Sequence, residues 1–254
     1  MKTVTKAKIL NYFGLFNIVR DLMYSRDKGN PEIEKFYKSF LCKESPLCFD
    51  VGANIGRVTD VLLGLGARVI AVEPNPECVR YLRKKYRFNR RVTIVPQAVD
   101  AGVGKKKLYM CEVNSLSTIV PDWIKVCKEE SKRYSEFNWN KEVDVDVTTL
   151  NNLIKEYGLP EYLKIDVEGS EFNVLKGLSQ RVPMISLELC PETVVLTQNY
   201  LPYLDSLGNN WFNFSSGETS EKFDLADWIS VTEVLALLKG NPRYGYLWSR
   251  SIPV

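Results

Sequence analysis

Four carboxylate side chains follow or end two apolar runs in the second half of the chain: Asp166, Glu168, Glu171 and Glu188. A single carboxylate has ordinary explanations, because it can favour a helix N-terminus, as Glu171 could, or accept hydrogen bonds from loop amides. Four of them at one sheet edge can orient or deprotonate a hydroxyl group, or bind Mg²⁺ through oxygen. The chain contains no histidine, so acid–base chemistry must use other groups. We therefore take Asp166, Glu168 and Glu188 as candidate catalytic residues and leave open whether a metal binds there.

A glycine-rich turn, FDVGANIG at residues 49–56, follows the first apolar run. It differs from the GxGxxG turn of dinucleotide-binding proteins, because Asn54 stands where the second glycine lets a pyrophosphate approach the backbone. Asp50 would repel phosphates but attract the ammonium and sulfonium groups of S-adenosylmethionine. Glu73 ends the next apolar run and can accept hydrogen bonds from both ribose hydroxyls. Each acid alone could simply cap a turn or a helix, but the three features together indicate S-adenosylmethionine as the cofactor.

The segment 96–100 follows the third apolar run and completes this candidate cofactor site. At the end of the third strand it would lie beside the adenine ring, with Gln97 and the backbone groups of Ala98 near the ring edge. The sequence therefore predicts three successive strand ends that together bind an adenosine-containing cofactor.

Ligands of open α/β sheets bind at the carboxyl ends of the strands, and the chain has the pattern of such a sheet. From Leu47 onward, short apolar runs alternate with helical patterns, which is typical of a mostly parallel sheet covered on both faces. Asn75 and Pro76 supply an N-cap and a first helical residue for one of the helices. We expect strands at 47–51, 69–73, 92–95, 162–165, 184–189, 211–214 and 244–248, and helices at 57–65, 75–88, 171–175, 193–207 and 230–238.

The pattern changes between residues 105 and 149. Two alternating stretches, 107–113 and 143–147, flank a charged and aromatic segment at 121–140. Alternation predicts paired strands, and a charged segment between them is typical of a surface loop. We expect a hairpin insertion whose middle segment is a mobile lid over the acceptor site.

Residues 1–45 are expected to form helices in front of the sheet. The apolar stretch 9–19 is interrupted by polar residues and glycine, so an amphipathic helix explains it better than a targeting or membrane-spanning segment. No Gly/Ser-rich linker divides the chain. We therefore expect an N-terminal helical extension over 1–45 and one catalytic domain over 46–254 that contains the insertion.

Four strings within residues 47–189 resemble the FkbM family of S-adenosylmethionine-dependent methyltransferases. FDVGANIG is similar to the family's glycine loop, EPNP at 73–76 to its second-strand acid, NSLST at 114–118 to its serine-bearing hairpin, and LKIDVEGSE at 163–171 to its most distinctive motif. The resemblance implies an α/β class I methyltransferase fold, Rossmann-like, with seven strands in the order 3-2-1-4-5-7-6, and methyl transfer to oxygen. The candidate cofactor-binding residues are then Asp50, Gly52, Ala53, Asn54, Gly56, Glu73, Pro74, Asn75, Gln97, Ala98 and Ser115.

Composition narrows the class of protein further. The net charge of +3, from 34 basic and 31 acidic residues, is too weak by itself to indicate a nucleic-acid partner. The six cysteines form no CxxC pair, which indicates reduced thiols and, with no membrane-spanning stretch, a cytoplasmic protein. A basic stripe could still bind phosphate, although a solvated helix face beside a charged hairpin explains it better: Arg80, Arg83, Lys84, Arg87, Arg90, Arg91 and Lys105–Lys107.

The leading hypothesis is an S-adenosylmethionine-dependent methyltransferase that acts on a hydroxyl of a saccharide, lipid or small metabolite. The turn DVEG at 166–169 lacks the Asn/Asp-Pro-Pro-aromatic pattern that often goes with methylation of base amines. One alternative is an RNA methyltransferase that uses the basic stripe. Another is a catalytically inactive protein that binds S-adenosylmethionine, which the presence of Asp166 and Glu168 disfavours. The sequence names neither the acceptor nor the oligomeric state.

Overall fold

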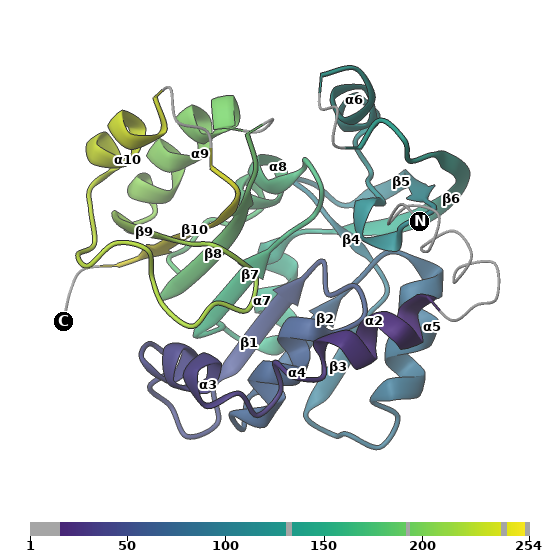
Figure 1. The fold of residues 1–254 in the computed structure, drawn as a ribbon, viewed down its shortest axis with the longest axis horizontal. Coiled ribbons are helices and arrows are strands. Elements are labelled where there is room, and N and C mark those ends of the chain that lie inside the picture. Colours follow the sequence, from purple (N-terminus) through teal and green to yellow (C-terminus); the bar gives the residue numbers. More distant parts are fainter. Residues whose placement is uncertain (1–15, 131–133, 192–193, 240–242, 252–254) are drawn as a thin grey trace.

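The computed structural model, shown in Figure 1, describes residues 16–130, 134–191, 194–239 and 243–251. Its centre is a seven-stranded sheet with the order β3-β2-β1-β7-β8-β10-β9. β4, β5 and β6 belong to a second, smaller sheet. When these three strands are left out of the numbering, the order is the predicted 3-2-1-4-5-7-6. β10 runs antiparallel to β8 and β9, and the other neighbouring strands are parallel. The strands are β1 Leu47–Val51, β2 Arg68–Val72, β3 Val92–Val95, β7 Tyr162–Ile165, β8 Met184–Leu189, β9 Trp211–Ser215 and β10 Gly245–Arg250.

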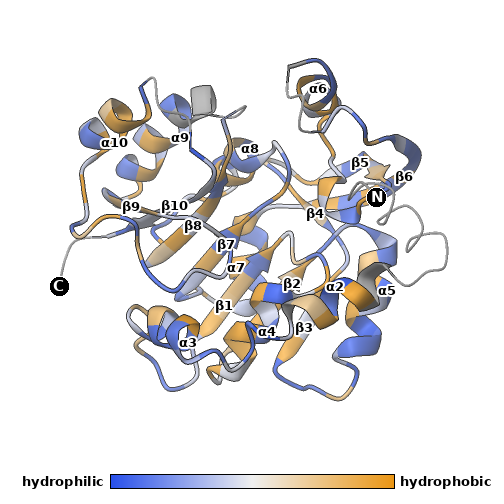
Figure 2. Cartoon of the chain, viewed as in Figure 1, coloured by the Kyte–Doolittle hydropathy of each residue, from blue (hydrophilic) through white to orange (hydrophobic). Residues whose placement is uncertain are grey.

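Helices cover both faces of this sheet, because alternate strand residues point to opposite faces. On one face, Phe49 and Val51 pack in a core with the buried residues of four helices, namely α7 Leu150–Tyr157, α8 Glu171–Lys176, α9 Val194–Ser206 and α10 Val231–Leu238. On the other face, Cys48 packs with α3 Pro31–Lys38, α4 Arg57–Gly64 and α5 Pro76–Lys85. Figure 2 shows the resulting pattern, with hydrophobic strands inside and hydrophilic residues on the outer helix surfaces.

Local capping explains where two of the helices begin. The Asn75 side chain accepts a hydrogen bond from the Glu77 backbone at 3.0 Å, and Pro76 is the first residue of α5, as predicted. α7 was not among the expected helices. Its N-cap is Thr149, whose side chain accepts a hydrogen bond from the Asn152 backbone at 3.2 Å.

The insertion pairs with β4 in a second sheet of order β4-β6-β5, and its antiparallel strands β5 and β6 confirm the predicted hairpin. β5 Gly104–Cys111 and β6 Trp139–Thr148 pair antiparallel, and β4 Ala98–Val99 adds to β6 in parallel. β6 extends beyond the expected stretch at both ends, whereas β5 both begins and ends earlier than expected. Between β5 and β6 lie the short helix α6 Pro121–Lys125 and one turn of π-helix at Val126–Glu130. Mobility of this segment stays a prediction.

In the described part of the chain, two helices precede β1, namely α2 Phe16–Tyr24 and α3. Residues 1–15 lie outside the described part of the chain, so the helix expected at 9–19 is described only from Phe16 onward. Phe36 and Tyr37 of α3 pack edge-on against Trp248 of β10, at ring-centroid distances of 5.3 and 6.2 Å. None of the helices in the described ranges is long and apolar enough to cross a membrane.

Candidate active site

A cavity of about 510 Å³ opens where the parallel strands end. Gly52 follows β1, Glu73 follows β2, Asp166 follows β7, and Glu188 lies near the end of β8; all four line the cavity. The insertion and the segments around β9 and β10 supply its remaining walls. A cavity of this size at strand ends is typical of a small-molecule site.

Most of the candidate site residues meet in this one cavity. Those from the glycine turn, the second and third strand ends and the hairpin would lie around the cofactor, and the acidic residues lie at the end of the sheet's central strands. The predicted site residues that line the cavity are Gly52, Ala53, Asn54, Glu73, Pro74, Gln97, Ala98, Ser115, Asp166, Glu168 and Glu188.

The glycine turn is shaped by its contacts with neighbouring strands. Gly52 has a φ of +79°, and a Cβ atom there would lie 1.7 Å from the Asp166 carbonyl oxygen, so a side chain would separate the ends of β1 and β7. The backbone N–H groups of Asn54 and Asn75 each donate to the Glu73 carboxylate at 2.8 Å. Burial raises the pKa of Glu73 to about 7 despite these two bonds.

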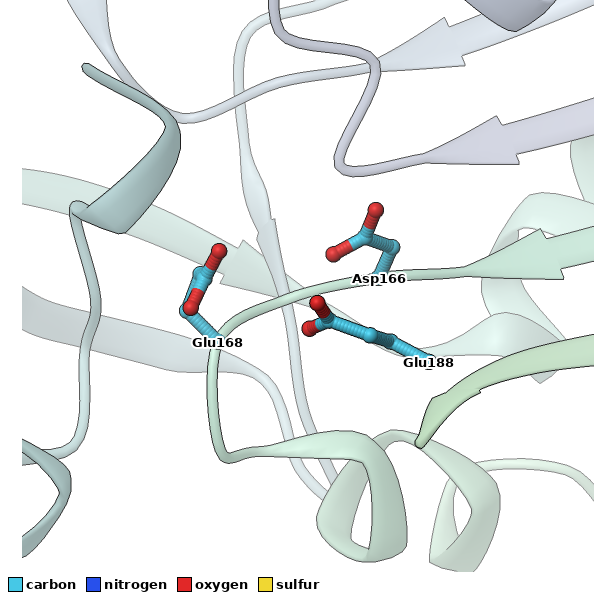
Figure 3. A group of neighbouring side chains, drawn as sticks. All are labelled: Asp166, Glu168 and Glu188. Atoms are coloured by element: carbon cyan, nitrogen blue, oxygen red, sulfur yellow. The ribbon is translucent and has the colours of Figure 1, made fainter. Parts of the chain in front are cut away.

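Asp166, Glu168 and Glu188 line this cavity, and Figure 3 shows their carboxylate groups close to one another. Each offers a carboxylate oxygen, and these atoms lie within 4.8 Å of one another. Burial, together with the negative charge of Asp166, raises the pKa of both Glu168 and Glu188 well above the ordinary range. A carboxylate with a raised pKa is a stronger proton acceptor than an ordinary one when it is ionised. The sequence leaves open whether a metal binds, and these three residues are the group that could hold one.

Comparison with known proteins identifies the family. Residues 50–210 match the model of the methyltransferase FkbM domain. The chain is also 30% identical over 201 residues to methyltransferase sdnD of Sordaria araneosa, which covers 69% of this chain and 75% of that protein. The chain belongs to the FkbM methyltransferase family.

Solved structures of other methyltransferases are similar at a lower level. The precorrin-6y C5,15-methyltransferase of Geobacter metallireducens has a TM-score of 0.43 at 13% identity, over 88% of this chain and 90% of that one. The O-methyltransferase of Bacillus cereus in complex with SAH has a TM-score of 0.44 at 9% identity, over 88% of this chain and 82% of that one. Likeness at this level says nothing about the acceptor.

Asp50 of this FkbM-family methyltransferase does not line the cavity, so the structure does not bring it together with the other predicted cofactor-binding residues. Its carboxylate is fully buried and accepts hydrogen bonds from the Thr59 backbone N–H at 3.1 Å and from the Thr59 hydroxyl at 2.6 Å. The physical reason is strand alternation: Asp50 points to the same face of β1 as Cys48, toward α4.

Gly56 and Asn75 also lie behind the cavity wall and not on it. Gly56 precedes α4 with a φ of +82°, and a Cβ atom there would lie 2.4 Å from the Tyr86 hydroxyl oxygen. The Asn75 side chain caps α5 and donates to the Ser117 hydroxyl at 3.4 Å. Both residues therefore shape the elements around the site, and their contact with the cofactor stays a prediction.

Glu171 has the ordinary role that the sequence allows. One oxygen of its buried carboxylate accepts hydrogen bonds from the backbone N–H groups of Val167 and Gly169 at 3.2 and 3.3 Å. Burial raises its pKa to about 7. Glu171 thus stabilises the loop that carries Glu168.

Lys164 is the main site residue that the sequence analysis missed. Its side chain is 1% exposed, and its ammonium nitrogen lies 3.4 Å from an Asp50 oxygen, 3.3 Å from Asp166 and 3.3 Å from Glu218. It also donates to the Gly52 carbonyl oxygen at 2.9 Å. The attraction of the three carboxylates raises its pKa well above the ordinary value, against the opposing effect of burial. The sequence does carry a sign of this site residue, because Lys164 is a charged residue inside an otherwise apolar central strand.

Tyr246 and Glu218 were missed as well, and both line the cavity. The Tyr246 hydroxyl donates to Asp166 at 2.6 Å. Glu218 connects Lys164 to Arg57, whose guanidinium lies 3.4 Å from its second oxygen and 2.5 Å from Asp27. Asp166 is therefore held between a hydroxyl and a buried ammonium group.

Proposed function

We propose that this chain transfers the methyl group of S-adenosylmethionine to a hydroxyl oxygen of a saccharide, lipid or small metabolite. The observation that carries the proposal is that one cavity contains both a glycine turn with a ribose-type carboxylate, Glu73, and a second group of half-buried carboxylates. The first set suits an adenosine-containing cofactor, and the second suits a proton-releasing acceptor.

The residues present fit S-adenosylmethionine. Each Glu73 oxygen accepts one backbone hydrogen bond, and a carboxylate oxygen has room for a second donor, such as a ribose hydroxyl. Ala98 lines the same cavity, where its backbone groups would hydrogen-bond the edge of the adenine ring. The acidic lining favours the positive ammonium and sulfonium groups of the cofactor over a pyrophosphate. When bound, the cofactor supplies an activated methyl group.

The chain's own contribution is alignment and proton acceptance. Methyl transfer from a sulfonium depends mainly on alignment of the acceptor oxygen, because the leaving group is already activated. Glu168 and Glu188 can hydrogen-bond the acceptor hydroxyl and, when ionised, take up its proton, since a carboxylate whose pKa is raised holds a proton more strongly than an ordinary one. Asp166 lies beside both and is oriented by Tyr246 and Lys164.

The RNA hypothesis is disfavoured by the charge pattern of the basic stripe. Lys105 pairs with Asp146, Lys106 with Asp100, and Lys107 with Glu142. These pairs reduce the positive charge that the hairpin offers to phosphates.

The proposed function is tested by following label from methyl-labelled S-adenosylmethionine into separate pools of sugars, lipids and RNA. Label is expected in a hydroxyl-bearing sugar, lipid or metabolite pool. Label in RNA alone, with a salt-dependent mobility shift of the RNA, would support the alternative. Tight cofactor binding without transfer to any pool would indicate the inactive binding protein.

Replacement of Glu73 by alanine is expected to weaken binding of S-adenosylhomocysteine by about 1–3 kcal/mol, because two ribose hydrogen bonds are lost. In the unmodified protein, affinity should also rise between pH 6 and pH 8. Ribose hydroxyls donate to the ionised carboxylate, and the Glu73 pKa of about 7 leaves it partly protonated at the lower pH. Titration calorimetry at several pH values measures both effects.

Glu77→Ala provides the matched control, because Glu77 lies on α5, pairs with the exposed Lys141 and does not line the cavity. It should leave affinity unchanged. An affinity of the Glu73 variant within twofold of the unmodified protein, or tighter binding of NAD than of S-adenosylhomocysteine, would remove the assignment.

A further inference from the structure

Glu168 has a backbone conformation that residues with side chains rarely adopt. Its φ is +56°, in the left-handed region, and the following Gly169 has a φ of +95°. A non-glycine residue in this region persists where surrounding contacts stabilise it, often at functional sites. The contacts of Glu168 therefore show which parts of the molecule keep it in place.

Two of these contacts come from the insertion, outside the seven-stranded sheet. The Thr118 hydroxyl donates to the Glu168 carbonyl oxygen at 2.7 Å, and the Trp123 indole N–H donates to the Glu168 carboxylate at 3.3 Å. Trp123 is 5% exposed, and its ring lies so close to Gly169 that a Cβ atom there would be 2.8 Å from the ring's Cγ. The segment 118–123 of the insertion therefore fixes both the backbone and the carboxylate of Glu168.

We propose that Trp123 and Thr118 are positioning residues, which hold the Glu168 carboxylate against the acceptor hydroxyl so that the insertion completes the catalytic site in addition to covering it. The inference rests on the proposed function of Glu168. A glutamate side chain has several rotatable bonds, and a proton acceptor must be placed within a fraction of an ångström of its productive position. A donor to the carboxylate and another to the carbonyl of the same residue provide that restraint.

A purely structural role for Trp123 is the competing explanation, because its ring also packs with Cys127 and Cys190. Trp123→Phe separates the two roles, since phenylalanine keeps a buried ring but lacks the indole N–H. Trp139→Phe is the matched control. Trp139 lies in the same insertion, and its indole N–H donates to the Leu116 carbonyl oxygen at 2.7 Å and not to Glu168.

The contact itself is tested on the protein alone by NMR of the indole N–H groups. The chain has five tryptophans, whose signals are assigned from single Trp→Phe variants. At constant pH, Glu168→Gln should shift the Trp123 indole signal and leave that of Trp139 in place. An unchanged Trp123 signal would overturn the inference.

The positioning role is tested with the acceptor that the labelling experiment identifies. Trp123→Phe and Thr118→Val should each lower kcat about 10–100-fold while the affinity for S-adenosylhomocysteine stays within about twofold. Trp139→Phe and Thr118→Ser, which retains the hydroxyl, should keep nearly full kcat. Equal kcat in Trp123→Phe and Trp139→Phe would overturn the inference. Failure of methyl transfer in the unmodified protein would instead overturn the proposed function and leave the NMR result standing.

Discussion

Replacement of Lys164 by methionine is expected to lower the free energy of unfolding by about 3–5 kcal/mol, the usual effect of removing one partner of a buried ion pair. Lys164 is 1% exposed and faces carboxylates of Asp50, Asp166 and Glu218. Within the described part of the chain, one oxygen of the fully buried Asp50 accepts no hydrogen bond. Methionine would fill the same space but leave that charge uncompensated in the sheet.

Denaturant unfolding measures this change, with Lys38→Met as the control. Lys38 pairs with Glu34 one helical turn away, at 3.4 Å and mostly exposed, so its loss should cost less than about 1 kcal/mol. The double variant Lys164→Met with Asp50→Asn should be less destabilised than the sum of the single variants, because asparagine removes the unpaired charge. Equal unfolding free energies for the Lys164 and Lys38 variants would contradict this account.

The sheet and its order could be predicted because apolar runs and caps carry local information. The strands around Phe49 and Leu163 are short apolar runs, and Asn75 with Pro76 defines the start of α5 within the sequence itself. The helix α7 was missed because its Thr149 cap is followed by two asparagines, which are weak helix formers.

The orientation of side chains at the site was harder to predict. Asp50 was expected to contact the cofactor because of its place at a strand end, but the alternation of β1 turns it toward α4. Lys164 could have been suspected as a charge inside an apolar run. Its partner Glu218 lies in the loop after β9, and only the folded sheet brings the two together at 3.3 Å. Contacts of this kind have no signature in the spacing of residues.

Asp166→Asn and Glu168→Gln are expected to lower turnover about 10²–10⁴-fold, the usual contribution of a positioned acid or base. Cofactor affinity should stay nearly unchanged, because the proposed ribose contact is made by Glu73, which follows β2 and not β7. The raised pKa of Glu168 and Glu188 also predicts a pH profile. A proton acceptor must be ionised, so turnover of the unmodified protein should fall as pH decreases, beginning well above the range of an ordinary carboxyl.

Steady-state kinetics with S-adenosylhomocysteine calorimetry on the same variants separates turnover from binding. Asp146→Asn is a suitable control, because Asp146 is exposed, pairs with Lys105 and does not line this cavity. If a divalent cation bridges the three carboxylates, a chelator should cause a similar loss that added Mg²⁺ reverses, whereas a metal-free proton acceptor would be unaffected. Parallel losses of cofactor affinity and turnover in both variants would place these carboxylates in the cofactor site, because a residue that acts on the acceptor alone cannot change binding of the demethylated cofactor.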